Sequence, residues 1–210
     1  KIKDGYIFAS AKKGLKGCKI KFPKISVGAT ENVLIAACFS EGETKLRNCA
    51  IEPEINDLIN FLKKMGCKIK RIGKRGIDIL GVKEFKPTIH KVIFDRIETG
   101  TYIIAAALTK GKLKIKNINP KIMLTEIRLL NKMGVDIIKK KNYILVSRSK
   151  KLKSVNVVTK PYPGFPTDLQ AQIMVLLCKG NNKSLIKEDI FENRFMHVAE
   201  LNRMGAQIST

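Results

Sequence analysis

One nine-residue pattern occurs three times in this chain and constrains its fold more than any other feature. In each copy an amphipathic stretch ends in a Met-Gly pair, and the copies are FLKKMGCKI at 61–69, LLNKMGVDI at 129–137 and ELNRMGAQI at 200–208. The glycine of each pair suits the left-handed conformation that ends many helices, because it has no Cβ to clash there. A basic residue lies just before each pair, where it opposes the negative end of the helix dipole. Three such copies indicate an internal repeat in which a helix stops and a strand begins.

The segments around this pattern repeat as well. Each copy is preceded by an Ala- or Leu-rich run typical of a buried helix: NVLIAACF at 32–39, TYIIAAAL at 101–108 and QIMVLLC at 172–178. Short strand-like pieces follow these runs, namely ETKLRN, KLKIKN and the looser SLIKED. Counting the strand that enters it, each repeat is predicted to be a βαβαββ unit, so the chain is expected to be of the α/β (α+β) class.

The repeats also predict where each unit begins and ends. We expect complete units at about 24–94 and 95–160, and a third unit that starts at Pro161 and stops at Thr210 before its last strands. Residues 5–22 resemble 142–158, the stretch that closes the second unit, and are expected to form a hairpin-like tail of an earlier unit. The chain is therefore expected to be a segment of a longer protein.

Composition limits the class of protein. The apolar content is 44%, which is ordinary for a globular chain, and the longest apolar runs are far shorter than the ~20 residues of a membrane span. No apolar secretory segment opens the sequence, so a soluble cytoplasmic protein with no membrane partner is expected. Five cysteines without a CxxC pair and only two histidines predict reduced, buried thiols and no metal site.

The net charge of +23 raises the possibility of a nucleic-acid partner. The excess is mostly lysine spread over nearly every predicted element, and aromatic residues make up only 6% with no tryptophan, so no stacking platform accompanies the charge. We interpret most of these lysines as a solvated surface and expect no nucleic-acid partner. A basic RNA-binding or RNA-end-processing repeat protein stays open as an alternative.

Four stretches depart from the composition of the repeat: KISVGAT at 24–30, FDRIETG at 94–100, FPTDLQAQ at 165–172 and IFENRFMH at 190–197. The first three precede the first helix of a unit, where free N–H groups and the helix dipole favour a phosphate. On the residues alone, an ordinary loop with a helix cap is the favoured interpretation.

Two side chains in these stretches could take part in chemistry. Asp168 could be a simple first-turn acid or a base that takes a proton from a substrate hydroxyl. Arg194 could hold a phosphate or carboxylate with its planar fork, or form a surface ion pair. Arg96 and Glu98 are expected to have structural roles.

The motifs SVGAT, EPEI, DRIETGT, FPTDLQAQ and FENRFMHV, in this order and spacing, resemble the UDP-N-acetylglucosamine enolpyruvyltransferase (UDP-N-acetylglucosamine 1-carboxyvinyltransferase) family over the whole chain. The resemblance implies two domains, each an inside-out α/β barrel of three βαβαββ units. It also implies transfer of the enolpyruvyl group of phosphoenolpyruvate to the sugar 3-hydroxyl, with release of phosphate. This is the first committed step of peptidoglycan synthesis, in the cytoplasm, and it uses no metal or organic cofactor.

The resemblance also implies roles for individual residues. A nucleotide-sugar site would be lined by Lys24, Ile25, Ser26, Val27 and Gly28. In the second domain, Asp168 would be the base that faces the sugar hydroxyl. Ile190 would contact the sugar through its backbone, and Arg194 would help to bind phosphoenolpyruvate.

Other features of the family would lie outside this chain or differ from it. Glu52 would lie near the cleft, whereas Ile51 stands where an arginine is expected. Residues 1–94 would be the last part of the first domain and 95–210 the first part of the second, joined by one of two hinge strands. The catalytic cysteine, a Lys-Asn pair and further arginines would lie elsewhere in the enzyme, so the chain alone is expected to be inactive. The related 3-phosphoshikimate 1-carboxyvinyltransferase is the alternative within the same fold.

Overall fold

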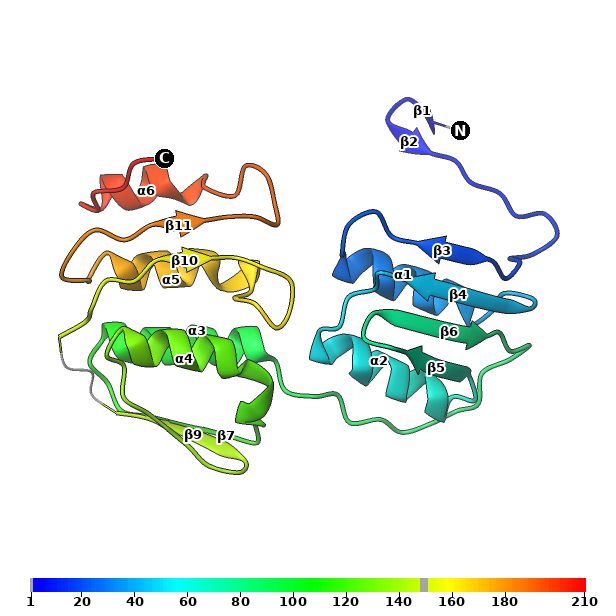
Figure 1. The fold of residues 1–210 in the computed structure, drawn as a ribbon, viewed down its shortest axis with the longest axis horizontal. Coiled ribbons are helices and arrows are strands. Elements are labelled where there is room, and N and C mark those ends of the chain that lie inside the picture. Colours follow the sequence, from blue (N-terminus) through cyan, green and yellow to red (C-terminus); the bar gives the residue numbers. More distant parts are fainter. Residues whose placement is uncertain (1, 148–150) are drawn as a thin grey trace. The chain divides into compact units, whose positions relative to one another are not determined.

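The computed structural model describes residues 2–147 and 151–210 (Figure 1). The chain divides into two compact units, Lys1–Ile93 and Phe94–Thr210. Each has its own hydrophobic core, built in the first unit around residues such as Leu34, Leu46 and Ile77 and in the second around Ile103, Met123 and Ile144.

The first unit has the order predicted from the repeat, βαβαββ, after a short N-terminal hairpin. Its four-stranded sheet has the order β3-β4-β6-β5, with β3 parallel to β4 and the other neighbours antiparallel. The elements are β1 (Ile2–Lys3), β2 (Tyr6–Ile7), β3 (Lys19–Lys21), α1 (Val27–Ala37), β4 (Glu43–Arg47), α2 (Pro53–Lys64), β5 (Lys68–Ile72) and β6 (Gly76–Leu80).

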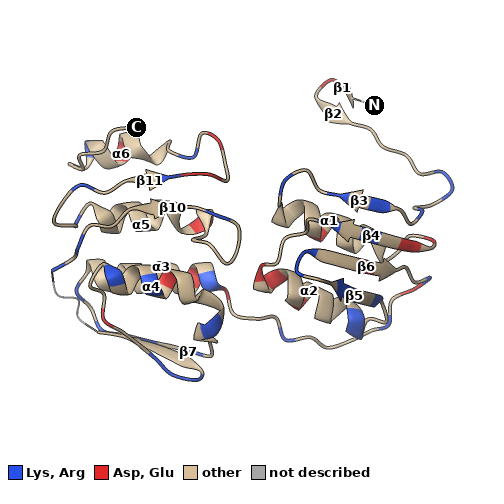
Figure 2. Ribbon diagram, viewed as in Figure 1, with Lys and Arg blue, Asp and Glu red and all other residues tan. Residues whose placement is uncertain are grey.

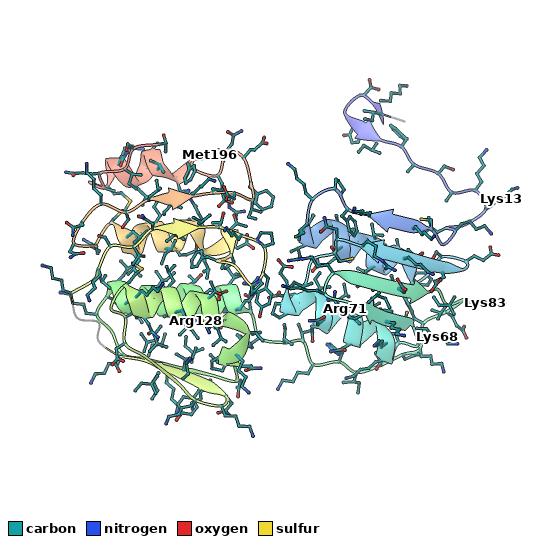
Figure 3. All side chains as sticks on the ribbon, viewed as in Figure 1. Lys13, Lys68, Arg71, Lys83, Arg128 and Met196 are labelled. Carbon is teal, nitrogen blue, oxygen red and sulfur yellow. The ribbon has the colours of Figure 1, made fainter. Side chains whose placement is uncertain are left out.

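Alternation along the strands explains why the two helices of this unit cover one face of the sheet. In β4 the side chains of Thr44 and Leu46 are buried while their neighbours point outward, as period-two strands require. The buried face of α2 consists of Ile55, Ile59 and Leu62, a spacing that places them on one side of a helix. The outward sheet positions are largely lysine and arginine (Figure 2). Arg71 of β5 instead reaches α2, where it donates to Asn56 Oδ1 (Figure 3).

The second unit contains one fuller repeat and the first part of another. Its sheets are three antiparallel strands in the order β7-β9-β8 and a parallel pair β10-β11. The elements are α3 (Arg96–Leu108), β7 (Leu113–Lys116), the 3-10 turn η1 (Pro120–Met123), α4 (Leu124–Lys132), β8 (Ile137–Lys139), β9 (Tyr143–Val146), β10 (Val157–Val158), the 3-10 turn η2 (Thr167–Leu169), α5 (Gln170–Leu177), β11 (Ile186–Lys187) and α6 (His197–Arg203).

The three Met-Gly pairs end three helices in the same way, which confirms the predicted repeat. The glycines Gly66, Gly134 and Gly205 follow α2, α4 and α6 with φ of +104°, +91° and +94°. In each case the residue after the glycine donates its N–H to a carbonyl five residues earlier, as Cys67 does to Leu62 at 3.1 Å. This is the Schellman arrangement, which satisfies the last carbonyls of a helix.

Three local predictions were wrong. No hairpin forms over residues 5–22, because β2 pairs with β1 and β3 pairs in parallel with β4. The same break separates β9 and β10, which belong to different sheets. In both copies of the repeat, the two strands expected to form a hairpin therefore belong to different sheets.

The other two errors concern single strands. The strand expected to enter the second unit is absent, since residues 81–95 form no strand. This segment instead lies along the first unit, where Lys86 N–H donates to the Met65 carbonyl at 2.8 Å and His90 Nε2 lies 3.0 Å from Asp57 Oδ1. Residues 206–210, after the third Met-Gly pair, are not a strand either, because a strand exists only where another strand pairs with it.

Two further features are absent from the described residues. Within residues 2–147 and 151–210, no helix is both long and apolar enough to cross a membrane. In the same part of the chain, no three His, Cys, Asp or Glu side chains gather as a metal site would require.

Candidate active-site residues

The loop at 24–28 leads into α1 in the first unit. Ser26 is the N-cap of α1, and its Oγ accepts the Ala29 N–H at 3.2 Å. Ser26, Val27 and Gly28 are exposed, and a Cβ added at Gly28 would meet nothing within 4 Å. The first turn of a helix has N–H groups without helical acceptors, so an anion could approach the backbone here.

The two flanking residues of this loop differ in what they can offer. Lys24 is exposed and supplies a positive charge. Ile25 is half-buried and packs against the core of the first unit, so its side chain anchors the loop and only its backbone is available to a ligand.

Three carboxylates lie near the same end of this unit. Burial raises the pKa of Glu31 above its usual value, and the negative charges of Glu54 and Glu52 raise that pKa further. Glu52 is itself buried and accepts the N–H of Ile51 at 2.9 Å. Ile51, the position where the family resemblance implies arginine, is half-buried.

In the second unit, Asp168 and Arg194 are brought together although they are 26 residues apart. Asp168 lies in η2, immediately before α5, and its side chain is 57% exposed. Arg194 Nη2 donates to Asp168 Oδ1 at 2.9 Å. Asp168 is not the N-cap, which is Pro166 and makes no side-chain bond, so the carboxylate is available for a partner other than its own helix.

Arg194 belongs to the loop between β11 and α6. Its guanidinium carbon lies 5.1 Å from the centre of the Phe191 ring, a distance at which a cation is attracted to the ring face. Ile190 lies in the same loop, and its N–H donates to Glu188 Oε1 at 3.0 Å. Met196 at the end of this loop is 84% exposed (Figure 3).

Sequence reasoning missed several polar side chains around this loop. Eight buried side-chain polar atoms have no hydrogen-bond partner within the described part of the chain, and six of them belong to Thr167, Gln170, Ser184, Glu188 and His197. Gln170 is the most buried of these residues, at 1% exposure, and neither Nε2 nor Oε1 is paired. The signal in the sequence was a pair of glutamines, Gln170 and Gln172, at the start of an otherwise apolar helix, QAQIMVLL.

The three buried cysteines do not offer a reactive nucleophile. Cys38, Cys49 and Cys67 are buried, which confirms the prediction for these three, while Cys18 and Cys178 are exposed. Burial and a hydrogen bond with Cys67 raise the pKa of Cys38 to about 12. Burial likewise raises the pKa of the Cys49 and Cys67 thiols, so these three groups stay protonated and unreactive at neutral pH.

Comparison with known proteins decides the family. Residues 1–210 match the family described as EPSP synthase (3-phosphoshikimate 1-carboxyvinyltransferase) over the whole chain. The chain belongs to the EPSP synthase family. The expected enolpyruvyltransferase-type α/β fold is thereby confirmed. The fold is similar to that of the enolpyruvyl transferase NikO from Streptomyces tendae, which superposes with a TM-score of 0.85 over 94% of this chain and 50% of its own, at 23% identity.

Within the EPSP synthase family, curated relatives carry the name anticipated from the motifs. UDP-N-acetylglucosamine 1-carboxyvinyltransferase from Pelagibacter ubique (strain HTCC1062) is 65% identical over 100% of this chain and 50% of its own length. The protein of the same name from Geotalea uraniireducens (strain Rf4) is 50% identical over 98% of this chain and 49% of its own. The chain thus spans about half the length of the curated relatives that it matches.

Proposed function

We propose that this chain is part of an enolpyruvyltransferase that acts on UDP-N-acetylglucosamine. The reaction would join the sugar 3-hydroxyl oxygen to the enol carbon of phosphoenolpyruvate and release phosphate. The observation that supports this best is the 65% identity to a UDP-N-acetylglucosamine 1-carboxyvinyltransferase over 209 residues of the chain. A catalytic role in the first step of peptidoglycan synthesis, in the cytoplasm, belongs to the same proposal.

In this proposal the first unit binds the nucleotide sugar. Lys24 and the first-turn N–H groups at Ser26, Val27 and Gly28 would hold the anionic part of the ligand, because charge and free backbone donors both favour phosphate. The backbone of Ile25 would contribute to the same loop. Residues 1–94 and 95–210 are proposed to belong to the two domains of the enzyme, each built from βαβαββ units.

Asp168 is proposed as the base in the second unit. In the structure Arg194 neutralises its carboxylate through the 2.9 Å hydrogen bond. An arriving phosphate or carboxylate of phosphoenolpyruvate would compete for the guanidinium, which binds such groups through two parallel N–H donors. Arg194 would then hold phosphoenolpyruvate, and the released Asp168 oxygen would accept the proton of the sugar hydroxyl. Ile190 is proposed to contact the sugar through its backbone.

The reaction as proposed needs no metal or organic cofactor. Its partners would be UDP-N-acetylglucosamine, phosphoenolpyruvate and the remaining parts of the enzyme. The chemistry that this chain would supply is orientation of the two substrates and acceptance of a single proton.

The test uses a chimeric enzyme in which residues 1–210 replace the matching half of the Pelagibacter ubique relative. Phosphate release from phosphoenolpyruvate should require UDP-N-acetylglucosamine and should not occur with shikimate 3-phosphate. Turnover with shikimate 3-phosphate but not with UDP-N-acetylglucosamine would show that the chain belongs to a 3-phosphoshikimate 1-carboxyvinyltransferase.

A basic RNA-binding protein is the second candidate, favoured only by the net charge of +23. That function predicts tight binding that falls steeply with salt, because phosphate contacts release counterions. Weak binding of single-stranded RNA by the 210-residue chain at physiological salt would exclude the RNA-binding function.

A further inference from the structure

Two segments of the chain are equivalent by a constant shift of 140 residues. Positions 26–47 correspond to 166–187: the N-caps Ser26 and Pro166, and the helix ends at Cys38 and Cys178, are related by this shift. The strands agree as well, since β4 lies parallel to β3 as β11 does to β10. The structure thus shows the same arrangement twice, once in each unit.

In the first copy a hydroxyl group ties the start of the helix to the loop after the strand. Thr30 is fully buried, and its Oγ1 donates to the Ser26 carbonyl at 2.7 Å. The same Oγ1 accepts the N–H of Ala50 at 3.0 Å. This side chain therefore fixes the loop that follows β4 relative to the start of α1.

In the second copy the same tie is missing. The equivalent of Thr30 is Gln170, which is 1% exposed and whose Nε2 and Oε1 both lack partners. Ile190 follows β11 by three residues, as Ala50 follows β4, but its N–H donates to Glu188 Oε1 instead. Leaving a buried polar group unpaired costs about 1–3 kcal/mol. A conformation of the neighbouring loop that gave the Gln170 side chain a hydrogen-bond partner would be favoured by about that amount.

We propose that Gln170 is a positioning residue for the loop at 188–194. In a second conformation of this loop the Ile190 N–H leaves Glu188 and donates to Gln170 Oε1, as Ala50 does to Thr30 in the first unit. Glu188 Oε1 keeps its other donor, the Phe191 N–H at 3.2 Å, so the exchange leaves that oxygen paired. A carboxamide has both a donor and an acceptor, as a hydroxyl does, and reaches farther from the backbone.

The consequence concerns Arg194, which belongs to the same loop. Fixing Ile190 on Gln170 sets the distance of Arg194 from Asp168, which precedes Gln170 by two residues. This last step rests on the proposed function, because it matters for catalysis only if Arg194 and Asp168 hold the two substrates. The hydrogen-bond exchange itself does not depend on the reaction.

The first experiment measures amide hydrogen exchange at Ile190 in the 210-residue chain. Inorganic phosphate is added in place of the anionic substrate that would bind Arg194. With phosphate present, the Ile190 amide should exchange about tenfold faster in Gln170→Leu than in the unmodified chain. In the variant it stays on the half-buried Glu188, whereas in the unmodified chain it moves to the buried Gln170 carboxamide, where exposing it to water costs more. Gln172→Leu is the matched control: Gln172 lies in the same helix but donates to Thr101 Oγ1 at 3.1 Å, so this variant should leave the exchange at Ile190 unchanged. Equal exchange in Gln170→Leu and the unmodified chain would overturn the proposal.

The second experiment uses the chimeric enzyme. Gln170→Leu should raise KM for phosphoenolpyruvate about tenfold with a smaller change in kcat, while its thermal midpoint stays the same or rises because an unpaired amide has been removed. A lower midpoint with unchanged KM would show a structural role only. Gln170→Met replaces the leucine variant if the latter does not fold. A crystal structure of the unmodified chimera with both substrates needs no variant, and Ile190 still bonded to Glu188 there would also overturn the proposal.

Failure of the two proposals can be told apart. If the chimera does not use UDP-N-acetylglucosamine, the proposed function fails, but the exchange at Ile190 still decides the role of Gln170. If turnover occurs and Gln170→Leu changes neither exchange nor KM, only the positioning role fails.

Discussion

At the scale of single residues, ionisable side chains differ in burial and in their charged partners. Asp168 is exposed and paired with a guanidinium, whereas Glu31 and Cys38 are shifted by burial toward their neutral forms. A proton acceptor in catalysis has to be within reach of the substrate, and of these three side chains Asp168 is the exposed one.

Asp168→Asn in the chimeric enzyme tests the proposed base. Turnover should fall by about 10²–10⁴-fold, the usual contribution of a general base. Stability should change little, because exposed ion pairs contribute only about 0–1 kcal/mol. Steady-state kinetics and urea unfolding measure the two effects, and near-normal turnover would show that Asp168 serves only local structure.

Glu31 predicts a specific pH dependence of stability. Its pKa in the folded chain is raised above 4.5, so the folded state binds this proton more tightly than the unfolded chain. The resulting stability is fully present below pH 4.5 and is lost as pH rises through the folded pKa. Glu31→Gln should therefore raise the free energy of unfolding at pH 7 relative to the unmodified chain, and this gain should disappear at pH 4. A gain that is equal at both pH values would contradict the assignment.

Thiol labelling tests the assignment of the cysteines. Cys18 and Cys178 should react quickly with iodoacetamide at pH 8, whereas Cys38, Cys49 and Cys67 should react only after unfolding, because they are buried with raised pKa values. Mass spectrometry before and after denaturation counts the labelled sites. Rapid labelling of Cys38 in the folded chain would refute the buried, protonated state.

At the scale of elements, close packing around α3 holds the start of α5 in place. A Cβ added at Gly100 of α3 would lie 2.5 Å from Leu169 Cδ1 in η2, so any larger residue would require the Leu169 side chain to shift. Arg96, the first residue of α3, pairs with Glu126 of α4 at 3.0 Å, and both side chains are buried. Arg96 also lies 5.5 Å from the centre of the Tyr162 ring. These contacts fix the segment that leads to Asp168.

The buried pair offers a test by double mutation. Glu126→Leu should lower the free energy of unfolding by about 3–5 kcal/mol, because it leaves the Arg96 charge buried without its carboxylate. The double variant Arg96→Met with Glu126→Leu should recover most of that loss, since two apolar side chains replace the charges. Urea unfolding gives both values, and additive losses would show that the two residues do not act as a pair.

At the scale of the whole molecule, the chain contains two compact units and covers half the length of its curated relatives. The proposed reaction requires both units together with the half of the enzyme that this chain does not match. Under the proposal, function at this scale is a property of the full-length enzyme.

The 210-residue chain alone should therefore release no phosphate from phosphoenolpyruvate with UDP-N-acetylglucosamine, whereas the chimeric enzyme should do so. A coupled phosphate assay on both proteins at equal concentration measures this. Turnover by the isolated chain would show that residues 1–210 contain a complete catalytic site.

The sequence by itself determined the repeat and its elements, because these depend on local chemistry. Glycine after the last helical turn favours a helix end, as at the three Met-Gly pairs of this chain, and alternating lysine and apolar residues favour strands with one buried face. The motifs around Ser26, Asp168 and Arg194 likewise indicate the family through their residues and spacing alone. Local rules sufficed for these features since neighbouring residues supply the interactions.

Only the tertiary structure decided which segments pair across the chain. It placed β2 and β3 in different sheets, laid residues 81–95 along the first unit without a strand, and joined Arg194 to Asp168. It also left Gln170 buried without a partner. Strand pairing and burial depend on residues far apart in sequence, whose contacts no local pattern specifies.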